Sequence, residues 1–293
     1  MVVVPAEGVR VCGRVFGADD LDVVRRIIAS DPPPHRLEIA RRTCEALGWR
    51  RPDGRLKEMS CRVALLRLMD RGLIVLPPPR TRNGNHGRFR LKRLVEVETA
   101  PVTEGVGKIA GLSLHVVRTP AESRLWNSAV AKFHYLGYRP LPGAQMRYLL
   151  RGDTGLLAVL GFGAGAWKVG PRDRWIGWSR EDREARLHLV VDNARFLILP
   201  GVRSPNLASF VLSACARRLP RDFRERYGYE PVLLETFVER ERFTGACYVA
   251  AGFTYVGDTQ GRGKLDREHR CGLPVKRIFV RPLVPDFRRV LCG

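Results

Sequence analysis

The sequence predicts an α+β protein with two domains, a small helical domain at the N-terminus and a larger α/β domain with a mixed sheet. Before residue 72, apolar residues recur at helical spacing in three segments. After residue 121, apolar runs typical of buried strands alternate with helical segments. The chain has 293 residues, 45% of them hydrophobic, which is enough for two cores of ordinary size.

The N-terminal segment, residues 1–93, has the layout of a winged helix-turn-helix domain. Three helices precede a short apolar strand at 72–76 and a basic, glycine-bearing hairpin at 80–90. In such domains the third helix enters the major groove of DNA and the hairpin lies along the backbone. The alternative is a helical packing domain whose arginines face water. The helices are expected at residues 21–30, 36–47 and 61–71, and DNA contacts at Arg62, Arg67, Arg80, Arg82 and Arg88.

Residues 94–120 are weakly patterned, and we expect them to form a linker or a docking strand. The α/β domain then covers residues 121–293. Its segment 167–183 is rich in tryptophan and arginine, Arg174 among them, and this combination suits base stacking and phosphate contact. Strands are expected at 147–150, 155–162, 187–199 and 232–238, and helices at 123–133, at 206–219 and around Cys247.

The net charge is the strongest functional signal in the composition. The chain has 51 Lys and Arg against 30 Asp and Glu, a formal charge of +21, which favours a polyanionic partner and most simply DNA. Arginine-rich composition is also typical of GC-rich genomes, which is the alternative explanation. The cysteines form no C-x-x-C pair, and no apolar run is long enough to span a membrane. We therefore expect a cytoplasmic protein without structural zinc.

Polar residues interrupt two strands of the predicted sheet. Asp192 and Asn193 lie inside one apolar run and Glu235 lies inside another, and a charge in a buried strand must be paired or used. Both strands lead toward the small-residue helix that carries Tyr248. We expect neighbouring ladder positions for the two carboxylates, and one cleft faced by Asp192, Arg195, Glu235, Tyr248 and Arg262, with His134 at its rim.

This set of residues supports two kinds of strand chemistry on DNA. In the first, Tyr248 is the nucleophile and Glu235 or His134 accepts the proton. In the second, Asp192 and Glu235 together hold a divalent cation such as Mg²⁺. In either case Arg195 and Arg262 would stabilise the phosphoryl oxygens.

Each candidate also has a structural interpretation. Glu235 would form a buried ion pair with Arg195. Tyr248 would be a core residue whose hydroxyl bonds to the backbone. His134, at the end of a helix, would serve in capping or packing. These interpretations leave the cofactor unknown, with Mg²⁺ as one candidate.

The second half of the chain resembles the GCN5-related N-acetyltransferase fold. Strands and helices alternate in the same order, and the small-residue helix ends in Ala250-Ala251-Gly252-Phe253, an aromatic-after-glycine turn similar to that family's. The resemblance implies a phosphate-binding loop between the fourth strand and the third helix. Here that loop, residues 199–206, has one glycine and two prolines, which lack the backbone donors that a pyrophosphate needs. We therefore do not expect coenzyme A to bind.

A closer resemblance covers nearly the whole chain. The segments HYLG at 134–137, DRWIGWS at 173–179, DNARFLIL at 192–199 and ETFV at 235–238 are similar to motifs of the Druantia A family. The resemblance implies DNA as the substrate or ligand. It also implies a place in anti-phage defence or in mobile elements, where similar proteins are labelled transposase-like, with other proteins of such a system as partners.

Three functions follow from these observations, and we rank them in this order. The first is a DNA-processing enzyme, transposase- or nuclease-like, whose N-terminal domain binds DNA and whose C-terminal domain cuts or joins strands. The second is a non-catalytic DNA-binding subunit of a defence system. The third is a group transferase that modifies nucleic acid. The sequence does not fix the oligomeric state, and a homodimer is one alternative.

Overall fold

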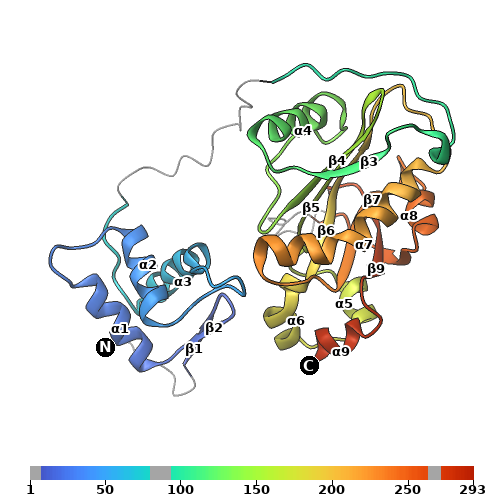
Figure 1. The fold of residues 1–293 in the computed structure, drawn as a ribbon. Helices are drawn as coiled ribbons and strands as arrows, with labels where there is room; N and C mark the ends of the chain where they lie inside the picture. Colours follow the sequence, from blue (N-terminus) through green and yellow to red (C-terminus); the bar gives the residue numbers. More distant parts are fainter. Residues whose placement is uncertain (1–7, 80–93, 263–271) are drawn as a thin grey trace. The chain divides into compact units, whose positions relative to one another are not determined.

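The computed structural model describes residues 8–79, 94–262 and 272–293. The chain divides into two compact units, residues 1–88 and 89–293, and each is described by itself (Figure 1). The first unit is mainly helical and the second is built around a seven-stranded sheet. No helix in the described ranges is long and apolar enough to cross a membrane.

The N-terminal unit contains three helices close to the predicted positions. They pack on one another around Leu21, Ile39 and Leu65, which are fully buried. A two-stranded antiparallel hairpin precedes the first helix, and its Phe16 joins the same core. The elements are β1 (Val9–Val11), β2 (Arg14–Phe16), α1 (Ala18–Ile28), α2 (Arg36–Ala46) and α3 (Glu58–Asp70).

The structure does not show the predicted winged helix-turn-helix. Residues 72–76 form no strand, and no strand among the described residues pairs with them. Arg25 donates to Leu73 O through Nη2 at 3.0 Å, and Arg36 Nε donates to Pro77 O at 2.6 Å. The predicted hairpin, with Arg80, Arg82 and Arg88, lies outside the described residues.

The second unit has the predicted mixed sheet. The strand order is β3-β4-β5-β6-β7-β9-β8, and every neighbouring pair is antiparallel except β6 and β7, which are parallel. The segment expected to be a linker or docking strand supplies the edge strand β3. The strands are β3 (Ser113–Val116), β4 (Met146–Gly152), β5 (Gly155–Ala164), β6 (Val190–Ile198), β7 (Leu233–Glu239), β8 (Thr254–Asp258) and β9 (Lys276–Pro282).

Helices cover both faces of this sheet. Two neighbouring residues of β4 show this, because successive side chains of a strand point to opposite faces. Arg147 Nη1 donates to Ser123 Oγ of α4 at 3.0 Å, and the Tyr148 hydroxyl donates to Asp222 Oδ2 of α7 at 2.7 Å. The helices are α4 (Pro120–Phe133), α5 (Gly170–Ile176), α6 (Arg180–Arg186), α7 (Leu207–Tyr227), α8 (Ala246–Ala250) and α9 (Phe287–Cys292), with 3-10 turns at Val106–Lys108 and Leu187–Leu189.

A glycine in the middle of β5 lets α4 approach the sheet. Trp126 of α4 is fully buried, and its indole N–H donates to Leu160 O at 2.9 Å. A Cβ on the next residue, Gly161, would lie 2.7 Å from the Trp126 ring. This position therefore tolerates no side chain unless the helix moves away.

We predict that Gly161→Ala lowers the free energy of unfolding by about 1–3 kcal/mol, because it overpacks the contact with Trp126. Urea denaturation followed by tryptophan fluorescence measures the loss. The control is Gly105→Ala, at a position where a Cβ meets no atom within 4 Å and φ is −59°. Equal stability of the two variants would contradict the packing argument.

Candidate functional site

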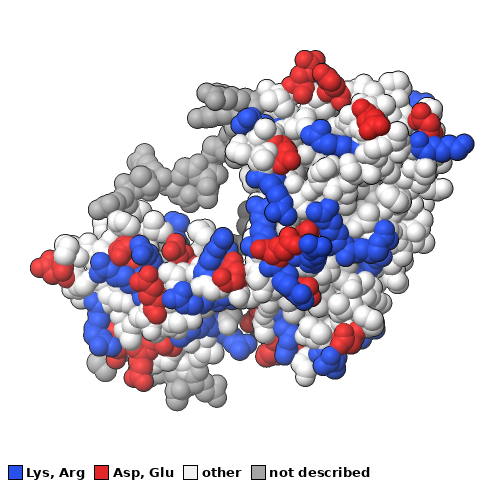
Figure 2. All heavy atoms as spheres, in the orientation of Figure 1, with Lys and Arg blue, Asp and Glu red and all other residues white. Residues whose placement is uncertain are grey.

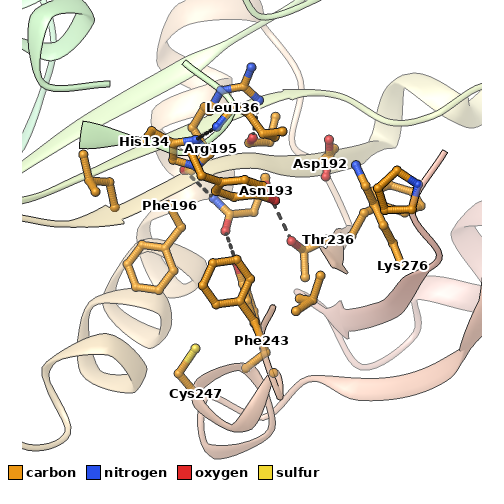
Figure 3. Close-up of a pocket in the computed structure, with 18 of the residues that line it drawn as sticks. His134, Leu136, Asp192, Asn193, Arg195, Phe196, Thr236, Phe243, Cys247 and Lys276 are labelled. Carbon is orange, nitrogen blue, oxygen red and sulfur yellow. Dashed lines mark hydrogen bonds between the residues drawn. The ribbon is translucent and has the colours of Figure 1, made fainter. Parts of the chain in front are cut away.

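A pocket opens where β6 and β7 diverge. The two strands pair over only three residues each, Val190–Asp192 with Leu233–Glu235. Farther along, β6 remains paired with β5 and β7 remains paired with β9, so the facing edges separate. A cavity of about 700 Å³ lies at this opening (Figure 3), within the range of small-molecule and cofactor sites.

A β-bulge in β6 decides which side chains share a side of the sheet. Gly161 of β5 pairs with Arg195, whereas the next residue, Phe162, pairs with Asn193, so Ala194 is an extra residue in β6. In a regular strand, residues 192 and 195 would point to opposite faces. The extra residue shifts the alternation by one and brings Asp192 and Arg195 to the same side.

The structure brings five of the six predicted site residues to this pocket and leaves the sixth outside it. Glu235 is fully buried and does not line the cavity. Its predicted ladder position opposite Asp192 is confirmed. The predicted residues that line the pocket are His134, Asp192, Arg195, Tyr248 and Arg262.

Asp192 is the carboxyl group of the pocket. Its side chain is half-buried, and its Oδ1 is buried without a hydrogen-bond partner in the described part of the chain. Burial, together with the neighbouring Glu235, raises the pKa of Asp192 well above its usual range, although Lys276 and Arg195 oppose this shift. A carboxyl whose pKa is raised in this way is a candidate proton donor or acceptor.

Two cations of the pocket have no carboxylate partner among the residues that the structure describes. Arg195 donates through Nη1 to Ala194 O at 2.6 Å, and its Nε is buried without a partner. Burial lowers the pKa of Arg195, although Asp192 opposes this shift. Lys276 of β9 stands beside Asp192 on the same side of the pocket (Figure 3). The two side chains are therefore placed to bind an anionic group.

Tyr248 holds α8 against β6. Its hydroxyl donates to Asn193 Oδ1 at 2.9 Å, and the side chain is only 7% exposed. Burial raises the pKa of Tyr248 above its usual value, so the phenol stays neutral. A tyrosine that is neutral and hydrogen-bonded to Asn193 is a poor nucleophile. Thr236 of β7 adds a second link to the same residue, because its Oγ1 donates to Asn193 O at 3.2 Å.

His134 is a weak base in this structure. Burial, with a smaller contribution from Arg195, lowers its pKa from 6.5 to about 4. Its Nδ1 accepts a hydrogen bond from the backbone N–H of Leu136 at 3.2 Å, which places the ring proton of the neutral form on Nε2. It caps the end of α4 and stacks on Tyr135 at 4.9 Å between ring centroids.

Glu235 forms a buried ion pair, but its partner is Arg172 and not the expected Arg195. Its Oε2 accepts from Arg172 Nη1 at 2.7 Å, and its Oε1 accepts from the backbone N–H of Ala166 at 2.6 Å. Both charged side chains are completely buried. Because both oxygens are occupied, Glu235 does not share a cation with Asp192. In the described residues, no group of three or more His, Cys, Asp or Glu side chains is placed to hold a metal ion.

The other predicted DNA contacts that the structure describes do not line the pocket. Arg62 and Arg67 are exposed on α3, and Arg174 is exposed on α5. Sequence reasoning missed Tyr135, Phe243 and Lys276, which line the pocket from loops and from β9. Tyr135 follows His134 directly in the segment HYLG, and this aromatic residue was the available signal.

The loop before α7 does not fit the pyrophosphate of coenzyme A. Pro200 and Pro205 carry no backbone N–H. The N–H of Val202 donates to Leu199 O at 3.1 Å, that of Arg203 to Val102 O at 2.8 Å, and that of Leu207 to Ser204 O at 3.4 Å. These donors point into the loop itself or to the segment 94–120, so they do not form a cradle for phosphate.

The geometry thus defines a protein whose α/β domain opens its sheet between two parallel strands to form a ligand pocket. The family model described as Druantia protein DruA matches residues 72–271. The chain belongs to this family of anti-phage defence proteins, as its motifs predicted. No curated protein matches the chain.

Solved structures of acyl-transferring enzymes are similar to parts of the chain. FeeM, an N-acyl amino acid synthase from uncultured soil microbes, is 14% identical over 62% of this chain and 94% of its own, with a TM-score of 0.37. The Drosophila melanogaster polyamine N-acetyltransferase is 12% identical over 58% and 100%, with a TM-score of 0.37. A GNAT-family acetyltransferase from Bacillus cereus is 12% identical over 46% and 69%, with a TM-score of 0.29.

We predict that Glu235→Gln lowers the free energy of unfolding by about 2–4 kcal/mol, because it removes one of the two carboxylates, Glu235 and Asp173, that pair with the buried Arg172. Chemical denaturation measures the change. The control is Glu241→Gln, which removes an exposed carboxylate. A loss below about 1 kcal/mol would mean that the pair contributes no more than a surface salt bridge.

His134 makes the stability of the folded chain depend on pH, and its lowered pKa gives the direction of this dependence. The unfolded chain binds a proton at His134 near pH 6.5, whereas the folded chain does so only near pH 4. We therefore expect its contribution to stability to be complete above pH 6.5 and to be lost as the pH falls to about 4. NMR titration of the ring should show the lowered pKa, and His134→Gln should flatten this part of the stability profile. An ordinary histidine titration would contradict the assignment.

Proposed function

We propose that this Druantia protein binds DNA and that the pocket between β6 and β7 is the place where it acts on a nucleotide. The observation that carries the proposal is the Asp192 carboxyl. Its Oδ1 is buried and has no hydrogen-bond partner among the residues that the structure describes, and its pKa is raised. It lines a cavity of about 700 Å³ together with Arg195 and Lys276. An acid that can move a proton, next to cations that can bind phosphate, suits chemistry on a nucleotide.

The electrostatics of the whole chain support a polyanionic partner. The net charge is +21, and Figure 2 shows Lys and Arg gathered over α7 on the α/β unit. Some of these arginines are in exposed helical ion pairs, such as Arg221 with Glu225. Exposed pairs of this kind contribute little energy and can rearrange when a phosphate approaches. Arg62 and Arg67 add exposed positive charge on α3 of the other unit.

Cleavage or joining of DNA strands would need residues other than Tyr248 and Glu235, to which the sequence analysis assigned it. Glu235 is engaged by Arg172, and the Tyr248 phenol is neutral and bonded to Asn193. Neither a tyrosine nucleophile nor a pair of metal-binding carboxylates is therefore available in this arrangement. In our proposal Asp192 holds or moves a proton at the bound nucleotide. Arg195 and Lys276 hold its phosphate.

A second candidate is a DNA-binding defence subunit that catalyses no reaction. The specific observation in its favour is that two of the predicted catalytic residues have structural roles. Glu235 anchors β7 through its ion pair, and Tyr248 ties α8 to β6. In this case the pocket would recognise a nucleotide without changing it.

We predict that Asp192→Asn abolishes protection against phage, raising the plating efficiency at least ten-fold in cells that carry the complete Druantia system. The amide keeps the shape of the side chain and its capacity for hydrogen bonds but cannot transfer a proton. The matched control is Asp153→Asn, an exposed aspartate outside the pocket.

DNA affinity of the purified variant, measured by fluorescence anisotropy, separates the two candidate functions. Lost protection with DNA affinity within about three-fold of the parent, a difference below 1 kcal/mol, supports proton transfer by Asp192. Full protection by Asp192→Asn would instead favour the non-catalytic subunit. A chain that binds no DNA at moderate salt would contradict both candidates.

A further inference from the structure

The rim of the pocket carries an exposed cluster of one leucine and two aromatic side chains, and proton transfer by Asp192 does not use it. It consists of Tyr135, Leu136 and Phe243, which are 38%, 43% and 48% exposed and which all line the cavity. The rings of Tyr135 and Phe243 lie 5.4 Å apart with an angle of 57° between their planes. We call these three residues the rim cluster. Exposed large apolar side chains that gather at a cavity mark a binding surface.

Positive charge lies directly on this cluster. The Arg242 guanidinium stands 4.7 Å from the centre of the Tyr135 ring. Tyr135 is also stacked with the neighbouring His134, with 23° between the ring planes. Flat aromatic faces combined with arginine are the means by which proteins bind unpaired nucleotides, because the rings stack on bases and the guanidinium contacts phosphate.

The backbone holds the rim cluster in place from two distant parts of the chain. Tyr135 follows the end of α4, whereas Phe243 lies in the turn between β7 and α8. The N–H of Phe243 donates to Glu239 O at 3.0 Å, which closes that turn. Gly245 then has a φ of +82°, and a Cβ there would lie 2.5 Å from the Phe279 ring. The turn is therefore built for this conformation, and the cluster is a formed surface.

From the rim the pocket leads to a polar end. Figure 3 shows Phe196 and Cys247 on one side of the cavity and Asp192 with Lys276 on the other. A protonated carboxyl presents one donor and one acceptor. Such a group can meet the Watson–Crick edge of a base, and apolar side chains can enclose its faces.

We propose that this pocket receives one unpaired nucleotide of DNA, with the base against the rim cluster and Asp192 at its hydrogen-bonding edge, and with the phosphate at Arg195 and Lys276. This inference rests on the proposed function and names its substrate. A base inside a duplex cannot enter such a pocket, so the nucleotide comes from a single strand or from a locally opened duplex.

Recognition of this kind depends on bases without reading their sequence. Every base has an aromatic face that can stack, so the rim cluster accepts all four. The carboxyl adds a hydrogen-bonding pattern that each Watson–Crick edge can meet. Binding should therefore fall when bases are removed and should change little when one base replaces another.

The test compares a fluorescently labelled single-stranded oligonucleotide with the same strand carrying abasic sites, which keep the phosphates and lack the bases. We expect the full chain to bind the abasic strand at least ten-fold more weakly. Tyr135→Ala and Phe243→Ala should each weaken binding of the normal strand about five- to ten-fold and leave the abasic strand almost unaffected. The matched control is Tyr255→Ala, a tyrosine that is 50% exposed on β8 and does not line the pocket.

Conservative variants guard against a loss of folding. Tyr135→Leu and Phe243→Leu keep apolar volume but remove the aromatic face, and circular dichroism confirms their fold. The same selective loss on the normal strand supports the inference. Equal affinity for normal and abasic strands overturns it while leaving DNA binding in place. If neither strand nor a duplex binds, the proposed function itself fails, so the two failures are distinguishable.

Discussion

The buried ion pair between Arg172 and Glu235 fixes the point at which the sheet opens. Glu235 is the last residue of β7 that pairs with β6, and it lies opposite Asp192. Arg172 reaches it from α5 and also donates to Ala166 O at 2.9 Å. The segment that follows β5 is thereby tied to the base of β7. Removing these charges from water is costly. Short hydrogen bonds from Arg172 to Asp173 and to Glu235, both at 2.7 Å, compensate for this desolvation.

The same pair sets the chemistry of its neighbour. Glu235 is close enough to Asp192 to help raise the pKa of that carboxyl. Beyond this ladder position the two strands separate. Asp192 therefore borders the cavity, whereas Glu235 is buried and does not line it. Two carboxylates at one ladder position consequently have different surroundings: Glu235 is held in a buried ion pair, and Asp192 borders the cavity. The environment of each group decides the role, in the same way that paired carboxylates divide their tasks in active sites.

Sequence reasoning predicted four of the seven strands, most helices and five residues that line the pocket, because these depend on local periodicity and on polar residues inside an apolar run. It could not identify the partner of Glu235, since Arg172 lies 63 positions away in a segment without a periodic pattern. Nor could it place the bulge at Ala194, which depends on the pairing with β5. The segment 72–76 resembled a strand, but Arg25 of α1 donates to its Leu73 carbonyl. Contacts of this kind arise only in the folded chain.

In our proposal, protonation of Asp192 and binding of a phosphate are physically coupled in this pocket. Lys276 and Arg195 favour the charged form of Asp192, against burial and Glu235. A phosphate bound by the same two cations would reduce their pull on the carboxyl and favour its protonated form. By linkage, proton uptake at Asp192 would in turn strengthen the binding of that phosphate. A nucleotide entering the pocket would thus prepare the acid that meets its base, and release of the phosphate would restore the affinity of the two cations for the carboxylate.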